Sequence, residues 1–138
     1  MNRSKLSWAI VSATLTADQI CKFLTAKFFP ALVIKNFGLP FSITLPAPTA
    51  TSGSNFFVFL AVAVTLLIFM LTARKFFGAN RTALSLILGG ALSNLADRAT
   101  LGYVRDVINV GVGTVNLADV AVWIGIGMLL FKIRNAKN

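Results

Sequence analysis

The side chains that could do chemistry in this sequence are few. The chain has no Glu, no His and one Cys, and its only acidic residues are Asp18, Asp97, Asp106 and Asp119. A Ser-His-Asp or Cys-His site is therefore excluded, and so is a metal ion held by imidazole. If the chain is an enzyme, its carboxylates must transfer the protons.

Two of these carboxylates, Asp106 and Asp119, are thirteen residues apart, which is enough for a reversing loop to bring them face to face. In a low-dielectric environment two adjacent carboxylates cannot both ionise easily, so the pair would share one proton near neutral pH. The ionised partner could then activate a water against a peptide carbonyl, while the protonated partner stabilises the oxyanion. Two aspartates and one water suffice for peptide hydrolysis. A gating or folding role in a channel-like protein is the alternative.

Two polar motifs accompany this pair. Asp18 and Lys22 are four residues apart, so they share one helix face, where a structural ion pair is favoured over direct catalysis. Asn94 and Asp97 also share a helix face, and Arg98 adds a planar fork of donors that suits carbonyls, carboxylates and phosphates. Helix packing alone would not explain these last three polar residues together.

The composition indicates what solvent surrounds these groups. Of 138 residues, 57% are hydrophobic and only 12% are charged, against about 25% charged in soluble domains. The excess apolar surface predicts a membrane protein. The net charge of +9 comes from short basic clusters between apolar runs, which is typical of helix ends at the cytoplasmic surface and not of nucleic-acid binding.

Four apolar runs predict four transmembrane helices. The clearest run is 18 uncharged residues long, or about 27 Å as a helix. The other three reach across a bilayer only if they continue through Asp18, Asp97 or Asp119, which places these acids inside helix ends, facing the bundle interior. The N-terminal run also resembles a cleavable signal peptide, but cleavage would leave Asp18 at a new terminus. The predicted spans are residues 6–26, 56–73, 82–101 and 114–133.

The basic clusters set the orientation. They precede the first span, join the second to the third and follow the fourth, so both termini are predicted to be cytoplasmic and all four acids to lie toward the outer face. The outer loop, residues 29–55, holds all four prolines and two predicted short strands, Ala31–Ile34 and Phe41–Leu45. The sequence therefore predicts one all-α membrane domain over residues 1–138, with four transmembrane helices and a small extracytoplasmic β-rich loop region.

Five short segments follow one another in a specific order: residues 18–22 (DQICK), 36–42 (NFGLPFS), 90–98 (GALSNLADR), 102–108 (GYVRDVI) and 116–119 (NLAD). Together they resemble the motifs of bacterial lipoprotein signal peptidase, the signal peptidase II family. The resemblance covers nearly the whole chain. It implies an aspartic endopeptidase of the bacterial cytoplasmic (inner) membrane that removes the signal peptide from diacylglyceryl-modified prolipoproteins, before the lipidated cysteine.

The resemblance also implies roles for individual residues. Asp106 and Asp119 would be the catalytic pair, at the periplasmic face. Residues that position substrate or support the pair would be Asn36, Asn94, Arg98 and Asn116. Structural polar residues would be Asp18, Lys22 and Asp97. The resemblance further implies a monomer with no cofactor and no metal, in contact with membrane lipid and inhibited by globomycin, a cyclic lipopeptide.

The chain departs from the family pattern at several positions, and the stretch between the two catalytic-type aspartates is short. Ser93 stands where Gly is expected, Pro40 where Ala is, and Arg105 where Val is. Arg105, beside Asp106, is expected to depress the pKa of that carboxyl. Two alternatives stay open: a non-catalytic relative that binds lipoprotein precursors or globomycin, and a small proton-coupled membrane transporter that uses the acids as a relay.

Overall fold

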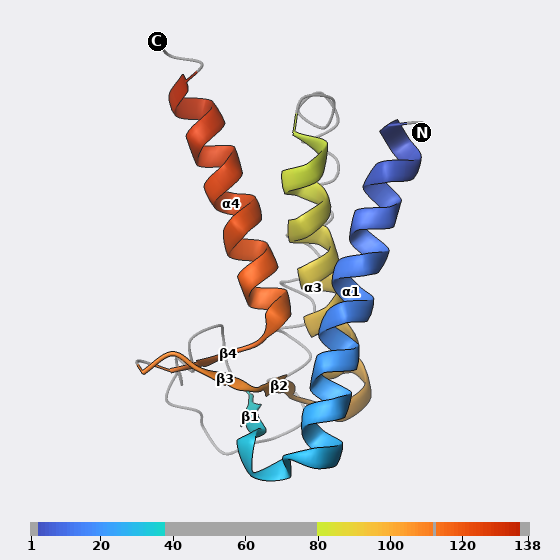
Figure 1. Ribbon diagram of the computed structural model, residues 1–138, viewed down its shortest axis with the longest axis vertical. Coiled ribbons are helices and arrows are strands. Elements are labelled where there is room, and N and C mark those ends of the chain that lie inside the picture. Colours follow the sequence, from blue (N-terminus) through green and yellow to red (C-terminus); the bar gives the residue numbers. More distant parts are fainter. Residues whose placement is uncertain (1–2, 38–79, 112, 136–138) are drawn as a thin grey trace.

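A computed structural model describes residues 3–37, 80–111 and 113–135 of the chain. Its long helices are α1 (Arg3–Phe28), α3 (Arg81–Leu101) and α4 (Leu117–Asn135). A 3-10 helix, Pro30–Leu32, follows α1. The short strands are β1 (Ile34–Asn36), β2 (Val104–Asp106), β3 (Ile108–Asn109) and β4 (Thr114–Val115). The strands gather at one end of the helices, opposite the start of α1 and the end of α4 (Figure 1).

Two predicted boundaries are wrong. Ala31–Ile34 is not a strand, because Pro30 occupies the first turn of a 3-10 helix, where its fixed φ is favourable, and Val33 N donates to Pro30 O. Strand β1 begins only at Ile34. The predicted fourth span begins at residue 114, but Thr114 belongs to β4, and α4 starts three residues later. Residues 56–73 and Phe41–Leu45 lie outside the described residues.

Helix α3 packs against both α1 and α4 (Figure 1), and small residues bring the backbones close. A Cβ added at Gly89 would lie 2.8 Å from Thr14 Cβ on α1, and one at Gly90 would collide with Ala118 O on α4. Large apolar side chains such as Trp8 and Phe23 face outward and are more than half exposed. Among the described helices, none combines the length and the apolar character needed to cross a membrane.

We expect Gly90→Ala to lower the free energy of unfolding by about 1–3 kcal/mol, because the new methyl overpacks the contact between α3 and α4. Besides the Ala118 carbonyl, it would meet Val122 Cγ2 at 2.8 Å. Gly127→Ala in α4 is the matched control, since nothing lies within 4 Å of its added Cβ. That variant should be neutral or stabilised by up to about 1 kcal/mol. Denaturant unfolding in detergent micelles compares the two, and equal stabilities would contradict the packing.

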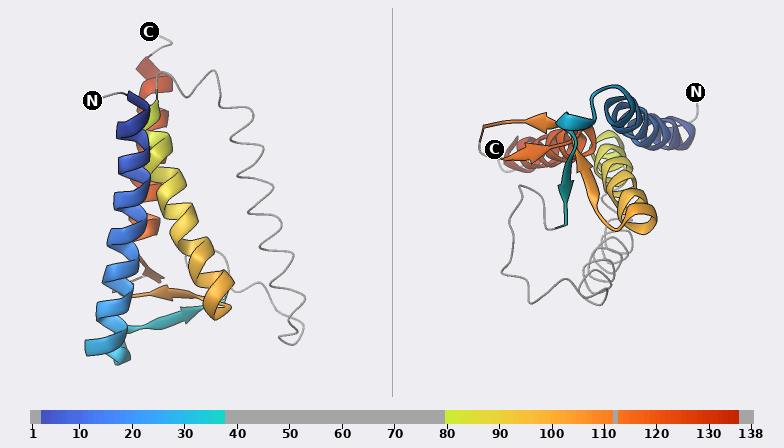
Figure 2. Two further views of the ribbon diagram at one scale, coloured as in Figure 1. Left: turned by 90° about the vertical axis from the view of Figure 1, so that its right-hand side faces the viewer. Right: turned by 90° about the horizontal axis from the view of Figure 1, so that it is seen from below.

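The strands form two antiparallel pairs that lie across the end of the bundle (Figure 2). Gly102, in the left-handed region at φ 81°, ends α3 and turns the chain toward β2. Strand β2 pairs with β1 so that Ile34 lies opposite Asp106. The connection between the two aspartates is then a hairpin, β3–β4, in which Ile108 lies opposite Val115. The hairpin returns the chain beside Asp106 just before α4 begins.

Candidate active site

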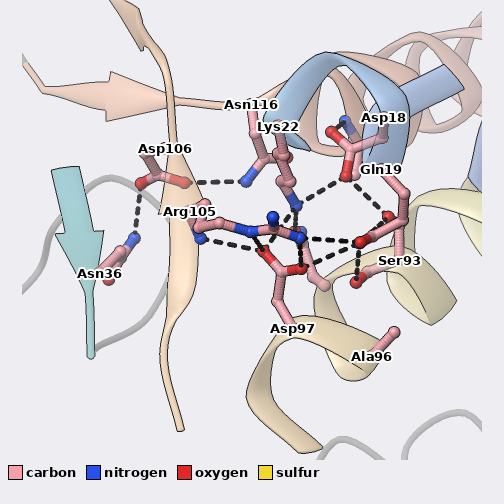
Figure 3. Close-up of polar contacts among 12 residues, drawn as sticks. Asp18, Gln19, Lys22, Asn36, Ser93, Ala96, Asp97, Arg105, Asp106 and Asn116 are labelled. Atoms are coloured by element: carbon pink, nitrogen blue, oxygen red, sulfur yellow. Dashed lines mark hydrogen bonds and ion pairs between the residues drawn. The ribbon is translucent and has the colours of Figure 1, made fainter. Parts of the chain in front are cut away.

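Asp106 lies at the end of β2 with its side chain fully buried. Its Oδ1 accepts a hydrogen bond from Asn116 Nδ2 at 2.8 Å, and its Oδ2 accepts one from Asn36 Nδ2 at 2.9 Å (Figure 3). Thr114 Oγ1 is 3.5 Å from the same Oδ2. Burial raises the pKa of the Asp106 carboxyl, and the nearby charge of Asp119 adds to this, against the lowering effect of the amide donors.

Asp119 lies in the first turn of α4 and is held by a reciprocal capping box. Asn116 Oδ1 accepts a hydrogen bond from Asp119 N at 2.9 Å, and Asp119 Oδ2 accepts one from Asn116 N at 3.2 Å. The other carboxylate oxygen accepts a hydrogen bond from Asn94 Nδ2 at 2.8 Å. The same residue, Asn116, therefore holds both Asp106 and Asp119. The local chemistry that starts α4 also positions this pair.

Asp18 and Lys22 form the ion pair that their spacing predicts, 2.6 Å apart and fully buried on α1. Asp18 Oδ2 also accepts a hydrogen bond from Ser93 Oγ at 2.7 Å. Its Oδ1 accepts one from the backbone N–H of Ala118 at 2.8 Å, in the first turn of α4. Helix α1 thus supplies an acceptor to an α4 amide that has no partner within its own helix.

Asp97 accepts hydrogen bonds from α1 and β2 together. Arg105 reaches it through its backbone N at 3.0 Å and through Nη2 at 2.7 Å, and Gln19 Nε2 donates to it at 2.9 Å. The expectation that Arg105 depresses the pKa of Asp106 is wrong. Neighbouring residues of a strand point to opposite sides, so Arg105 points toward Asp97 and Gln19 while Asp106 points away (Figure 3).

Lys22 connects the residues around Asp97 with those around Asp119. Its Nζ lies 3.3 Å from Asp97 Oδ2 and donates to Asn94 Oδ1 at 3.0 Å, and Asn94 in turn holds Asp119. Arg98 interacts electrostatically with Asp119 and with Asp106. The structure therefore brings every predicted site residue into one polar assembly at the strand end of the bundle.

Sequence reasoning missed three members of this assembly. Gln19 was given no role, although it follows Asp18 in the first motif; it donates to Ser93 Oγ at 2.9 Å as well as to Asp97. Ser93 is predicted from the sequence only as a departure from the family pattern, and Arg105 acts on Asp97 and not on Asp106 as predicted. The signal in the sequence is that Gln19 follows Asp18 and that Ser93 lies four residues before Asp97, on the same face of a helix rich in small residues.

A buried carboxylate pair joined by an amide can hold one proton and present one basic oxygen to a water. That arrangement suits acid–base hydrolysis without a covalent intermediate. Within the described part of the chain, no group of three or more acidic or cysteine side chains is placed to hold a metal ion.

Comparisons with known proteins identify the family. The model of the signal peptidase (SPase) II family matches residues 5–134. The lipoprotein signal peptidase of Caldicellulosiruptor bescii is 31% identical over 133 residues, covering 91% of this chain and 89% of that protein. The enzyme of the same name from Thermodesulfovibrio yellowstonii is 36% identical over 139 residues, with 90% of each chain covered.

The fold is shared as well. A solved structure of a bacterial membrane enzyme superposes with a TM-score of 0.76 at 23% identity, covering 94% of this chain and 92% of that one. The match of the family model over most of the chain, together with the two relatives, is sufficient to assign the family. The chain therefore belongs to signal peptidase II, a family of aspartic endopeptidases of the bacterial membrane that remove signal peptides from prolipoproteins.

Proposed function

We propose that this chain cleaves diacylglyceryl-modified prolipoproteins immediately before the lipidated cysteine, with Asp106 and Asp119 as the catalytic pair. Signal peptide removal is the activity of its family. The observation that carries the residue assignment is the position of Asn116, which donates to Asp106 and exchanges two hydrogen bonds with Asp119.

In the proposed reaction, the pair shares one proton, which Asp106 carries at rest. Asp119 accepts a proton from a water as the water oxygen attacks the scissile carbonyl carbon, and Asp106 donates its proton to the oxyanion. The C–N bond of the tetrahedral intermediate then breaks. The leaving amine takes the proton from Asp119, and a hydroxyl of the intermediate returns one to Asp106, which restores the pair.

The amides around the pair fit a supporting role. Asn36, Asn94 and Asn116 each donate to one of the two carboxylates, so their side chains hold the pair in place. Arg98 is the side chain best suited to bind the substrate backbone, because its fork of donors suits carbonyl oxygens and its charge acts on both aspartates. Asp18, Lys22 and Asp97 hold the helices together around the site.

We further propose that residues 1–138 form one membrane domain with four transmembrane helices, both termini in the cytoplasm and the site at the periplasmic face. The start of α1 and the end of α4 lie at the same end, away from β2 and the start of α4 (Figure 1), the elements that hold Asp106 and Asp119, which supports this orientation. Lys132 and Arg134 in the last turn of α4 agree with a cytoplasmic end. We also propose that the protein is a monomer and that globomycin binds at this site.

The purified protein in detergent or nanodiscs is expected to cut a diacylated precursor and to leave an otherwise identical, unlipidated precursor intact. Mass spectrometry should find the new N-terminus at the lipidated cysteine. Globomycin should block turnover, while EDTA should have little effect, because carboxylates and water suffice. Binding of the diacylated precursor without any product would contradict the proposal, and substrate-dependent proton movement in vesicles would favour a transporter.

A further inference from the structure

Two buried carboxylates of the assembly share one ammonium group. Lys22 Nζ lies 2.6 Å from Asp18 Oδ2 and 3.3 Å from Asp97 Oδ2, and all three side chains have at most 1% of their surface exposed. Two negative charges against one positive charge would leave one buried charge uncompensated, which is strongly unfavourable. Arg105 supplies a second cation in direct contact with Asp97.

Arg105 reaches Asp97 from the middle of β2, with 16% of its side chain exposed. Its Nη2 lies 2.7 Å from Asp97 Oδ1, its Nε 3.3 Å from Oδ2, and its Nη2 also donates to Gln19 Oε1 at 2.8 Å. The guanidinium therefore binds the carboxylate through two nitrogens and is itself held by α1. Among the groups joined by direct ion pairs, the charges of Asp18, Lys22, Asp97 and Arg105 sum to zero, and Arg98 also acts on Asp97 electrostatically.

This balance determines where Lys22 donates its protons. Its nearest partner is Asp18, and its other short contact is Asn94 Oδ1 at 3.0 Å, closer than Asp97 at 3.3 Å. Without Arg105, Asp97 would have lost its closest cation, so it would attract the Lys22 ammonium more strongly and draw it from Asn94. Asn94 Nδ2 is a donor to Asp119 Oδ1, so its orientation would loosen as well.

We propose that Arg105 is a positioning residue for the peptidase: by neutralising Asp97, it keeps Lys22 bonded to Asn94 and thereby holds the Asn94 amide on Asp119. The inference rests on the proposed catalytic role of Asp119. Arg105 lies on the face of β2 opposite to Asp106. The geometry of the aspartate pair would then depend on a charged side chain that contacts neither aspartate.

Arg105→Met is expected to lower kcat for the diacylated precursor by about 3- to 30-fold, the usual range for a coupled polar network, with KM within about twofold of wild type. Arg105→Lys should keep most of the kcat, because an ammonium can still pair with Asp97. The matched control is Lys35→Met. Lys35 lies opposite Arg105 in the strand pair and is exposed over the Tyr103 ring, so this variant removes one positive charge and should keep wild-type kcat.

A double variant, Asp97→Asn with Arg105→Met, tests charge compensation directly. Removing both charges restores neutrality, so its kcat should exceed that of Arg105→Met alone. The proposal is overturned by wild-type kcat in Arg105→Met, by equal losses in Arg105→Met and Lys35→Met, or by a double variant no better than the single one. A change in KM alone would also overturn it, since it would mean that substrate contacts Arg105 in the hollow it lines with Ile20 and Phe23.

Two further measurements keep the test decisive. If Arg105→Met does not fold, Arg105→Lys and the double variant carry the test, because both keep the cluster neutral and both must fold and turn over. Asp119→Asn is assayed in parallel. Turnover by that variant would show that the proposed function has failed, whereas an inactive Asp119→Asn beside a fully active Arg105→Met would show that only the present inference has failed.

Discussion

Asp106→Asn and Asp119→Asn are each expected to reduce the kcat for a diacylated precursor by about 10⁴-fold, to the detection limit of a gel or mass-spectrometric assay. An amide keeps the size and most of the hydrogen bonds of the carboxylate, but it can neither accept a proton from water nor return one. Each variant should still bind globomycin and elute as a folded protein. Turnover retained in both variants would rule out the assigned mechanism.

The stability of Asp106→Asn separates loss of chemistry from loss of fold. Burial raises the pKa of Asp106 above its ordinary value of 3.8, so the folded wild type binds this proton more tightly than the unfolded chain. The contribution of Asp106 to stability is therefore present below pH 3.8 and is lost as pH rises through the folded pKa. Asp106→Asn is neutral at every pH and does not lose stability in this way. At a pH above the folded pKa of Asp106, its melting temperature should therefore lie near the wild-type value, although the variant has one hydrogen-bond acceptor fewer.

Lys22→Met is expected to lower the free energy of unfolding by about 3–5 kcal/mol, because it leaves two buried carboxylates without their shared ammonium. Lys27→Met on the same helix is the control. Lys27 is exposed and lies 5.3 Å over the Phe28 ring, so its removal should change stability by no more than about 0.5 kcal/mol. Unfolding in detergent micelles measures both, and similar losses would show that the buried ion pair does not hold α1 in place.

Part of this site could be predicted because the relevant interactions are local. Residues four apart share a helix face, so the Asp18–Lys22 ion pair follows from spacing alone, and the structure confirms it. Asn116 and Asp119 also have capping-box spacing, three residues apart. That pattern was available in the sequence, and reading it would have placed the start of α4 at Leu117 and not at residue 114.

The interactions between elements could not be predicted in the same way. Adjacency in sequence favours an effect of Arg105 on Asp106, but β2 directs adjacent side chains to opposite sides. Strand β2 also contacts α3, and there Arg105 reaches Asp97. The pairing of Asn36 with Asp106 depends on the register of β1 against β2. Neither the register nor the placement of a strand follows from hydropathy. The motifs therefore indicate which residues belong to the site, but not which of them bond to each other.

The hydrogen bond from Ala118 N to Asp18 Oδ1 joins residues that are 100 positions apart, and this has a consequence for biogenesis. A ribosome delivers α1 to the membrane long before it delivers the turn that holds both Ala118 and Asp119. Until then Asp18 lacks one of its partners, and Asp106 has no second carboxylate beside it. We expect a nascent chain to gain proteolytic activity only when α4 docks, so that an enzyme still under synthesis should not cut prolipoproteins.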